Sequence, residues 1–197
     1  MKSFDKVIKC FRKLQGVGRR QAERFTVHFL RAPESEVAEF TQALLDMRKN
    51  VHYCKKCFNY AEDDICSICA DSSRDKSQIC VVQEARDIEA IEKTKIFKGV
   101  YHVLHGAVSP LEGKNLDNLK VKELVLRVQD SQVEIKEVII ATNPDSEGEL
   151  TALYLADLLR GKVQKVSRIG YGIPLGAQID YIDEMTLLHA LKGRTKL

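Results

Sequence analysis

The sequence predicts an α/β protein in which a helical N-terminal region and a small four-cysteine module precede a mainly parallel sheet flanked by helices. Three observations support this fold class. Apolar residues recur at helical spacing near the N-terminus, two C-x2-C pairs follow, and short β-branched runs then alternate with helical segments. Strands that alternate with helices are typical of parallel sheets.

The first 52 residues are expected to form the helical region. Apolar stripes predict helices over residues 3–14 and 19–31, and Cys10 on the first stripe is expected to be a buried thiol. Pro33 ends the second helix, because its ring cannot continue the hydrogen-bond pattern. Ser35 is predicted to cap the N-terminus of a third helix.

Four cysteines predict a metal site. Cys54 and Cys57 form one C-x2-C turn, and Cys66 and Cys69 form a second. Each turn directs two thiolates to one point, and two turns complete the tetrahedral S4 shell of structural Zn²⁺. We expect one zinc ion in a module at residues 53–70, with no catalytic role, since a full S4 shell leaves no position for water. Disulfides are the alternative, but the sequence shows no secretory signal that would favour them.

Four short apolar runs are predicted strands, and helices lie between them. The polar residues 71–78 are interpreted as a linker, the sheet domain as residues 78–170 and the C-terminal segment as residues 171–197. The expected strands are 79–82, 101–104, 138–141 and 165–169, and the expected helices are 87–94, 121–128, 147–159 and 183–192.

Charge is unevenly distributed. The formal net charge is +3, but residues 1–31 contain nine Lys and Arg against two acids, so that this end carries +7 and the remainder −4. A basic end on a mildly acidic body predicts a polyanion as partner. No apolar run approaches the ~20 residues of a membrane span, and we expect a cytoplasmic protein.

The turn between the first two helices is the candidate contact with that polyanion. Gly16 and Gly18 allow a tight turn and close approach of the backbone, and Arg19, Arg20 and Arg24 follow at the start of the next helix. The N-terminus of a helix attracts anions through its free N–H groups. The pattern resembles the helix-hairpin-helix motif of DNA-repair proteins, and an ordinary helix–helix turn is the alternative.

An acidic segment follows the third predicted strand. It resembles the metal-binding motif of Toprim domains, but Asn143 stands at an aspartate position and Gln83 at the glutamate position, with Glu84 beside it on the opposite face. Two amides remove two charges from a magnesium cage, and we therefore expect no catalysis. Glu84, Asn143, Asp145 and Glu147 are expected to form a site that binds a partner. The alternative for Asp145, Glu147 and Glu149 is capping and dipole compensation at the start of the next helix.

The order of these features resembles the bacterial RecR family over essentially the whole chain. The similar stretches are residues 14–22, 54–69, 73–75, 101–106, 109–111, 141–155 and 171–176. The resemblance implies a Toprim domain that binds partners without catalysis, DNA contacts at Arg20 and Arg24, and ring-like homotetramers that clamp duplex DNA. It also implies that RecO, and possibly RecF, act with the protein to load recombinase onto gapped DNA at the bacterial nucleoid.

Two other functions are the alternatives. A Mg²⁺-dependent Toprim nuclease or topoisomerase-like enzyme would need an intact acidic triad, which the amides interrupt. A zinc-dependent protein adaptor without DNA contact fits the cysteines but leaves the basic hairpin without a role. The sequence therefore favours a non-enzymatic DNA-binding subunit.

Overall fold

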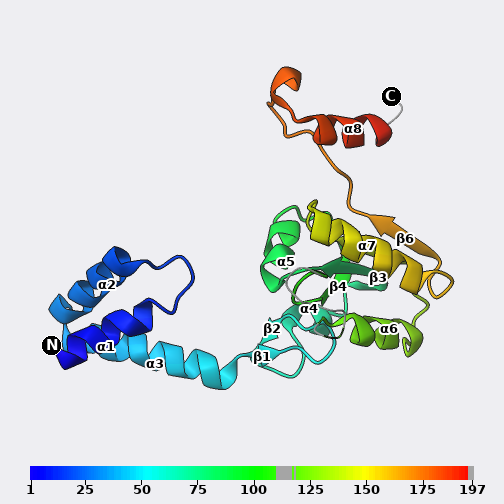
Figure 1. Cartoon of the computed structure of the whole chain (residues 1–197). Helices are drawn as coiled ribbons and strands as arrows, with labels where there is room; N and C mark the ends of the chain where they lie inside the picture. Colours follow the sequence, from blue (N-terminus) through cyan, green and yellow to red (C-terminus); the bar gives the residue numbers. More distant parts are fainter. Residues whose placement is uncertain (110–116, 118, 195–197) are drawn as a thin grey trace. The chain divides into compact units, whose positions relative to one another are not determined.

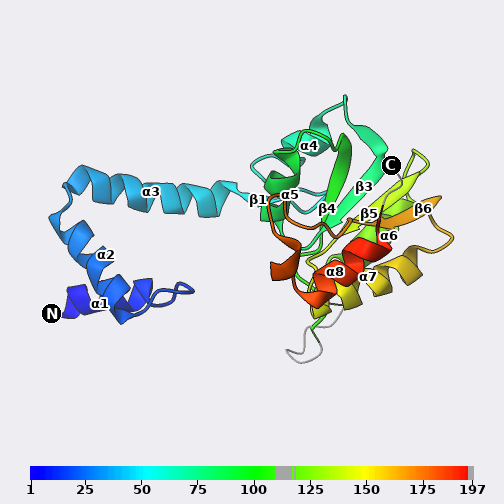
Figure 2. The same ribbon diagram turned by 90° about the horizontal axis from the view of Figure 1, so that it is seen from above.

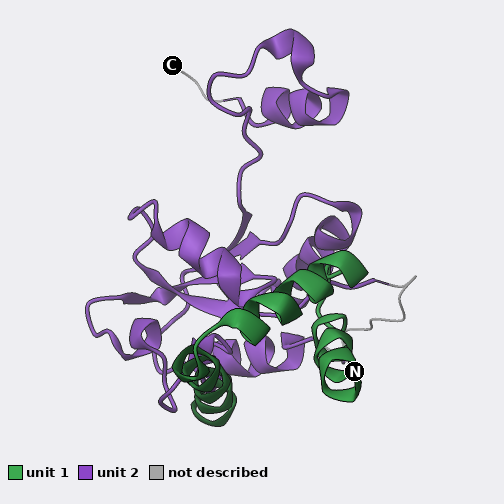
Figure 3. Cartoon of the chain, turned by 90° about the vertical axis from the view of Figure 1, so that its left-hand side faces the viewer, with its two compact units in different colours: residues 1–51 green, residues 52–197 purple. Residues whose placement is uncertain are grey.

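The computed structural model describes residues 1–109, 117 and 119–194. The chain divides into two compact units, residues 1–51 and 52–197 (Figure 3). Pro110 and Leu111, part of one stretch that carries the family resemblance, lie outside the described residues, as do the last three positions of the predicted C-terminal segment. Among the described helices, none has both the length and the apolar character that a membrane crossing requires.

The first unit consists of helices α1 (Lys2–Phe11), α2 (Arg19–Arg31) and α3 (Glu34–Asn50) (Figure 1). Aromatic rings join them, since Phe11 stacks on Phe29 with ring centroids 6.0 Å apart and Phe29 contacts Phe40 at 4.8 Å. Only Ala22 and Thr26 are buried in these three helices. The unit therefore buries few residues fully: most apolar side chains of α1 and α2 are half-buried, and most of those in α3 are exposed.

Two predictions about this unit are wrong. Helix α3 begins at Glu34 with Pro33 as its N-cap residue, so Ser35 lies inside the first turn. Proline holds φ near the helical value and has no N–H to leave unpaired, which explains an earlier start than the serine suggested. Cys10 is exposed, because the apolar stripe of α1 is only partly covered by α2.

The second unit contains a four-stranded sheet with the order β4-β3-β5-β6, in which each neighbouring pair is parallel (Figure 2). The strands are β3 (Asp75–Val82), β4 (Gly99–Val103), β5 (Glu137–Ala141) and β6 (Lys165–Arg168). The predicted parallel sheet flanked by helices is confirmed. The predicted linker 71–78 is too long, because β3 already begins at Asp75, where buried Ser77 satisfies its hydroxyl by a 2.6 Å bond to the Asp75 carboxylate.

Two apolar layers cover the two faces of this sheet. Ile79 and Val81 of β3 point to one face, where α6 (Val121–Gln129) and α7 (Ser146–Leu159) pack. Cys80 and Val82 point to the other, which is covered by α5 (Ala85–Glu92) and by Phe58 and Ile68 of the cysteine module. The alternation along β3 is the period of two that a strand with two buried faces requires.

The cysteine module precedes the sheet, and a C-terminal segment follows it. The module contains the antiparallel strands β1 (His52–Tyr53) and β2 (Tyr60–Ala61) and the short helix α4 (Ser67–Ala70). The C-terminal segment contains η3 (Ile179–Tyr181) and α8 (Glu184–Lys192), and neither of these two elements has a buried residue.

Candidate functional site

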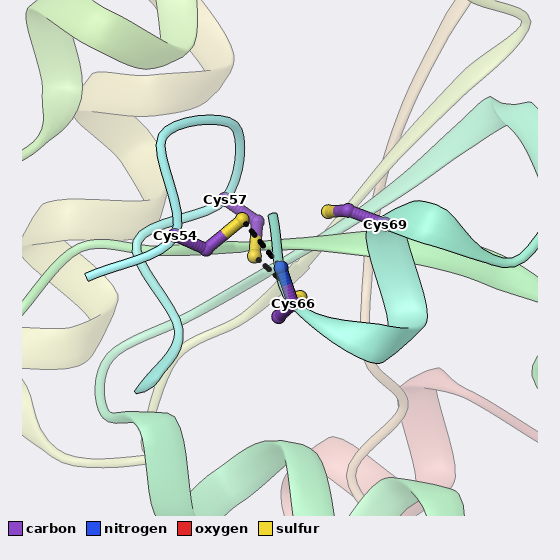
Figure 4. A group of neighbouring side chains, drawn as sticks. All are labelled: Cys54, Cys57, Cys66 and Cys69. Carbon is purple, nitrogen blue, oxygen red and sulfur yellow. Dashed lines mark hydrogen bonds between the residues drawn. The ribbon is translucent and has the colours of Figure 1, made fainter. Parts of the chain in front are cut away.

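The four predicted cysteine ligands meet in one cluster. The sulfur atoms of Cys54, Cys57, Cys66 and Cys69 all lie within 4.8 Å of one another, and the four side chains are buried (Figure 4). Cys57 Sγ and Cys66 Sγ are 3.5 Å apart. A tetrahedral zinc site with Zn–S bonds of about 2.3 Å has S···S edges of about 3.8 Å, whereas a disulfide bond is about 2.05 Å long. The cluster therefore has the dimensions of a metal site.

Hydrogen bonding prepares the cluster to hold a cation. The backbone N–H of Cys66 donates to Cys54 Sγ over 3.3 Å. The hydrogen bond between Cys57 and Cys66 lowers the pKa of Cys66 and raises that of Cys57, because the two thiols share a proton. A bound dication removes these protons, since a coordinating thiol is deprotonated.

The turn between α1 and α2 leaves open space around its two glycines. Gly16 has φ +76°, a conformation that a side chain would strain, whereas Gly18 is extended and serves as the N-cap of α2. A Cβ atom at either glycine would meet nothing within 4 Å. No side chain caps the start of α2, so its first N–H groups face outward.

A basic hollow runs along α2 from Arg20 to Ala32. Arg20, Arg24 and Arg31 line it together with His28, and its volume is about 780 Å³. The sequence-based prediction included Arg20 and Arg24 but missed Arg31 and His28. Their positions, eight and eleven residues beyond Arg20, place them on the same helix face, and this spacing was the available signal.

Arg19 differs from the other predicted DNA contacts. Its Nε donates to Glu23 Oε1 over 2.9 Å, which offsets its charge within the helix. The pair is exposed, and salt weakens such pairs. Arg19 is therefore expected to contribute less to anion binding than Arg20 or Arg24.

At the ends of β3 and β5, Gln83 and Asn143 are in contact. Gln83 follows β3 and is buried, and its Oε1 accepts a hydrogen bond from the backbone N–H of Asn143, which follows β5. The Gln83 side chain thus joins the ends of two adjacent strands. An amide is suited to this contact because it is uncharged when buried.

Glu84 does not replace the missing acid, because its carboxylate is engaged elsewhere. It is the N-cap residue of α5 and forms a capping box with Asp87, whose carboxylate accepts the Glu84 N–H over 2.8 Å. Asp145 has a similar duty at the start of α7, where its Oδ1 accepts the N–H of Gly148 over 2.7 Å. Two of the predicted site acids therefore act as helix caps.

Glu147 is the acid most open to a partner. Its side chain is exposed on the first turn of α7, and one oxygen accepts a hydrogen bond from Ser109 Oγ. Among the described residues, Glu147 has no ion-pair partner. The hydroxyl fixes the direction of the carboxylate without neutralising its charge.

An arginine that the sequence did not reveal neutralises the last acid of the motif. Arg168, at the end of β6, pairs with Glu149 over 2.5 Å and also donates to Thr142 Oγ1 and to the carbonyl of Asn143. Desolvation tends to raise the pKa of Glu149, but hydrogen bonds from Tyr171 and Arg168 outweigh it and lower that pKa below the usual value. A guanidinium therefore occupies the surroundings of this carboxylate, which disfavours a second cation there.

Family models match the chain in four consecutive segments. The model described as RecR, helix-hairpin-helix, matches residues 4–48, and that of the RecR four-cysteine zinc finger domain matches residues 51–71. A Toprim domain model matches residues 77–170, and RecR, C-terminal, matches residues 172–195. The second match coincides with the buried cysteine cluster, and together they confirm that the chain is built for one structural zinc ion.

Proposed function

Because this chain belongs to the RecR family, which gives it a role in DNA recombination and repair, we propose that it acts there as a non-catalytic DNA-binding clamp subunit. Its task is to help load recombinase onto gapped DNA together with RecO and possibly RecF. The setting is the bacterial cytoplasm, at the nucleoid. The hairpin supports DNA binding, the strand ends support partner binding without catalysis, and the uncovered apolar surfaces support assembly.

DNA binding is assigned to the first unit. The basic hollow along α2 contains arginine side chains, and the N-terminus of the same helix, which follows Gly18, has no side-chain cap. Both features attract phosphate, and neither distinguishes one base from another. We therefore propose sequence-independent binding to the backbone of duplex and gapped DNA through Arg20 and Arg24, with a smaller part for Arg19.

The observation that carries the non-catalytic proposal is the use of the acids at the strand ends. The Gln83 side chain accepts the backbone N–H of Asn143, Asp145 caps α7, and Glu149 pairs with Arg168. Catalytic magnesium requires charged oxygen ligands held near octahedral geometry. In the described part of this site, Glu147 is the one acid of the motif that neither caps a helix nor pairs with a cation.

The same edge suits protein recognition. Glu147 presents a surface carboxylate whose direction is set by Ser109. A basic surface on a partner such as RecO would complement it, and complementary charges set the specificity and rate of association. We propose that this end of the sheet is the partner site.

Uncovered apolar surface supports assembly of several copies. Leu30 is 70% exposed, Leu45 is 59% exposed and Leu175 is fully exposed. Monomeric proteins seldom leave so many large apolar side chains uncovered. We propose that the first unit and the C-terminal segment pack on other copies of the chain in a ring-like homotetramer.

The experiment that tests this function uses purified zinc-loaded protein with supercoiled, gapped and single-stranded DNA in Mg²⁺ or Mn²⁺. The proposal requires binding without cleavage, relaxation or primer synthesis. Turnover that disappears in Asp145→Ala would favour the alternative, a Toprim nuclease or topoisomerase-like enzyme. Turnover that persists in Asp145→Ala would indicate a contaminating enzyme.

A further inference from the structure

The zinc module is hydrogen-bonded to the edge strand of the sheet through its first C-x2-C turn. The carbonyl of Cys57 accepts the backbone N–H of Val103, the last residue of β4, over 2.8 Å. The next carbonyl, that of Phe58, accepts a hydrogen bond from His105 Nε2, also over 2.8 Å. A metal ligand and the residue that follows it therefore contact Val103, at the end of this strand, and His105, two residues beyond.

Phe58 is held in an uncommon backbone conformation. Its φ is +63°, in the left-handed region, which a large non-glycine residue adopts only when its surroundings enforce it. Its ring lies edge-on to His102, with centroids 5.4 Å apart, and Lys120 Nζ lies 5.1 Å from the ring centroid. Coordination by Cys57 is a further restraint on the same turn, since Phe58 follows that ligand directly.

From His105, hydrogen bonds continue to the partner site. His105 also has a positive φ, +61°, and the next residue, Gly106, donates its N–H to the carbonyl of Gln83 over 3.0 Å. The Gln83 side chain in turn accepts the N–H of Asn143. A short chain of contacts therefore runs from Phe58 to the end of β5, where the turn into α7 begins.

We propose that His105 is a positioning residue that couples metal binding by the Cys57 turn to the geometry of the strand ends. When the cysteines are coordinated, the Phe58 carbonyl is fixed and orients His105, and the loop at Gly106 holds Gln83 in place. When they are not, Phe58 is free to leave the left-handed region and this support is lost. The coupling rests on the proposed function in one respect: the strand ends that it affects are the proposed partner site.

Coupling of this kind is reciprocal. If coordination steadies the strand ends, then breaking the contact at His105 must also weaken the hold on the metal by the same free energy. A histidine with a purely structural role would change global stability and leave no such link. The two effects can be measured separately on the full-length zinc-loaded chain.

The experiment compares wild type with His105→Leu, which removes the donor, and with His105→Gln, which supplies an amide N–H at similar reach. His52→Ala is the matched control, because this exposed histidine lies in β1 of the same module and, among the described residues, its side chain has one hydrogen bond, to the neighbouring Tyr53 carbonyl at 3.4 Å. One readout is the rate of zinc release to a chromogenic chelator. The other is hydrogen exchange at the amides of Gly106 and Asn143.

For His105→Leu we expect zinc release and exchange at both amides to accelerate about fivefold, the effect of one net hydrogen bond. His105→Gln should restore most of both effects, and His52→Ala should change neither. Acceleration of only one readout, or of neither, would overturn the proposal. So would an equal acceleration at Val138 in the centre of the sheet, because it would show general destabilisation.

Partial chelation of the wild-type protein provides a second test if His105→Leu fails to fold. The proposal expects faster exchange at Gly106 and Asn143 while Val138 stays protected, and unfolding of the whole sheet would contradict it. Neither arm contains DNA or a partner protein. Failure of the coupling therefore leaves the proposed function standing, and loss of partner binding elsewhere leaves the coupling standing.

Discussion

His102 should make the stability of this protein depend on pH. The side chain is fully buried in β4, and its Nε2 donates to the carbonyl of Lys120 over 2.7 Å. Its Nδ1 has no hydrogen-bond partner within the described part of the chain. Desolvation lowers its pKa from 6.5 to about 3, so that the ring stays neutral in the folded protein at any pH above that value.

The sign and size of the effect follow from proton linkage. Between pH 6.5 and pH 3, His102 is protonated in the unfolded chain but neutral in the folded protein. The free energy of unfolding therefore rises with pH across this window and falls on acidification. With these two pKa values, lowering the pH from about 7.5 to about 5 should cost about 2 kcal/mol of unfolding free energy.

Urea unfolding of wild type and His102→Gln at several pH values measures this effect. The glutamine can donate to the Lys120 carbonyl but does not titrate, so its stability should fall by about 2 kcal/mol less over the same range. Zinc content must be measured at each pH, since acid also competes for the cysteine ligands. Parallel losses in the two proteins would show that His102 does not bear the linkage.

Three further predictions concern the metal, the packing of α7 and the partner site. Cys57→Ser should lose zinc by mass spectrometry and lose cooperative thermal unfolding, because zinc binding energy is largely folding energy; a metal-free wild type of equal stability would disprove the role of the metal. Gly148→Ala should destabilise the fold by roughly 2 kcal/mol or more in urea, since its Cβ would lie 2.1 Å from the Asn143 carbonyl oxygen. The usual effect of alanine in a helix, a gain of up to about 1 kcal/mol, would contradict this packing. Glu147→Ala should weaken binding of a basic partner such as RecO in a pull-down while zinc content and fold stay unchanged, and Glu147→Lys should weaken it more because it adds repulsion. Equal binding by all three proteins would remove Glu147 from the partner site.

Local patterns in the sequence were sufficient for the parallel sheet and the cysteine cluster. The β-branched runs of β3 and β5 point to both faces of a buried sheet, and the C-x2-C spacing fixes the direction of the thiolates. Both signals are contained within a few residues. The burial of Cys10 could not be predicted in this way, because it depends on how much of the α1 stripe another helix covers.

The arrangement of the strand ends could not be predicted from local patterns. Gln83 and Asn143 are 60 residues apart, and Glu149 and Arg168 are 19 apart, yet each pair is in contact. The sequence suggested that two amides weaken a metal site, but it did not show that the Gln83 side chain accepts the backbone N–H of Asn143. Nor did it show that an arginine compensates the remaining acid, because both contacts depend on the register of adjacent strands.

The contacts between the zinc module and the sheet could not be predicted from local sequence patterns either. Phe58 and His105 are 47 residues apart, and no pattern marks either residue as a partner of the other. Their positive φ values belong to the folded backbone, and neither residue type favours that conformation strongly enough to predict it.

The salt dependence of duplex binding measures whether Arg20 and Arg24 of the hairpin bind DNA phosphates. Wild type, Arg20→Ala/Arg24→Ala and the control Lys93→Ala, whose lysine pairs with Glu89 on α5, are titrated with two unrelated duplexes over a range of salt concentrations. The double variant should bind both duplexes more weakly, and its log–log salt slope should fall by roughly 2, about one for each arginine that no longer neutralises a phosphate. The control should match wild type. A double variant that keeps the affinity and slope of wild type would show that the hairpin does not bind DNA.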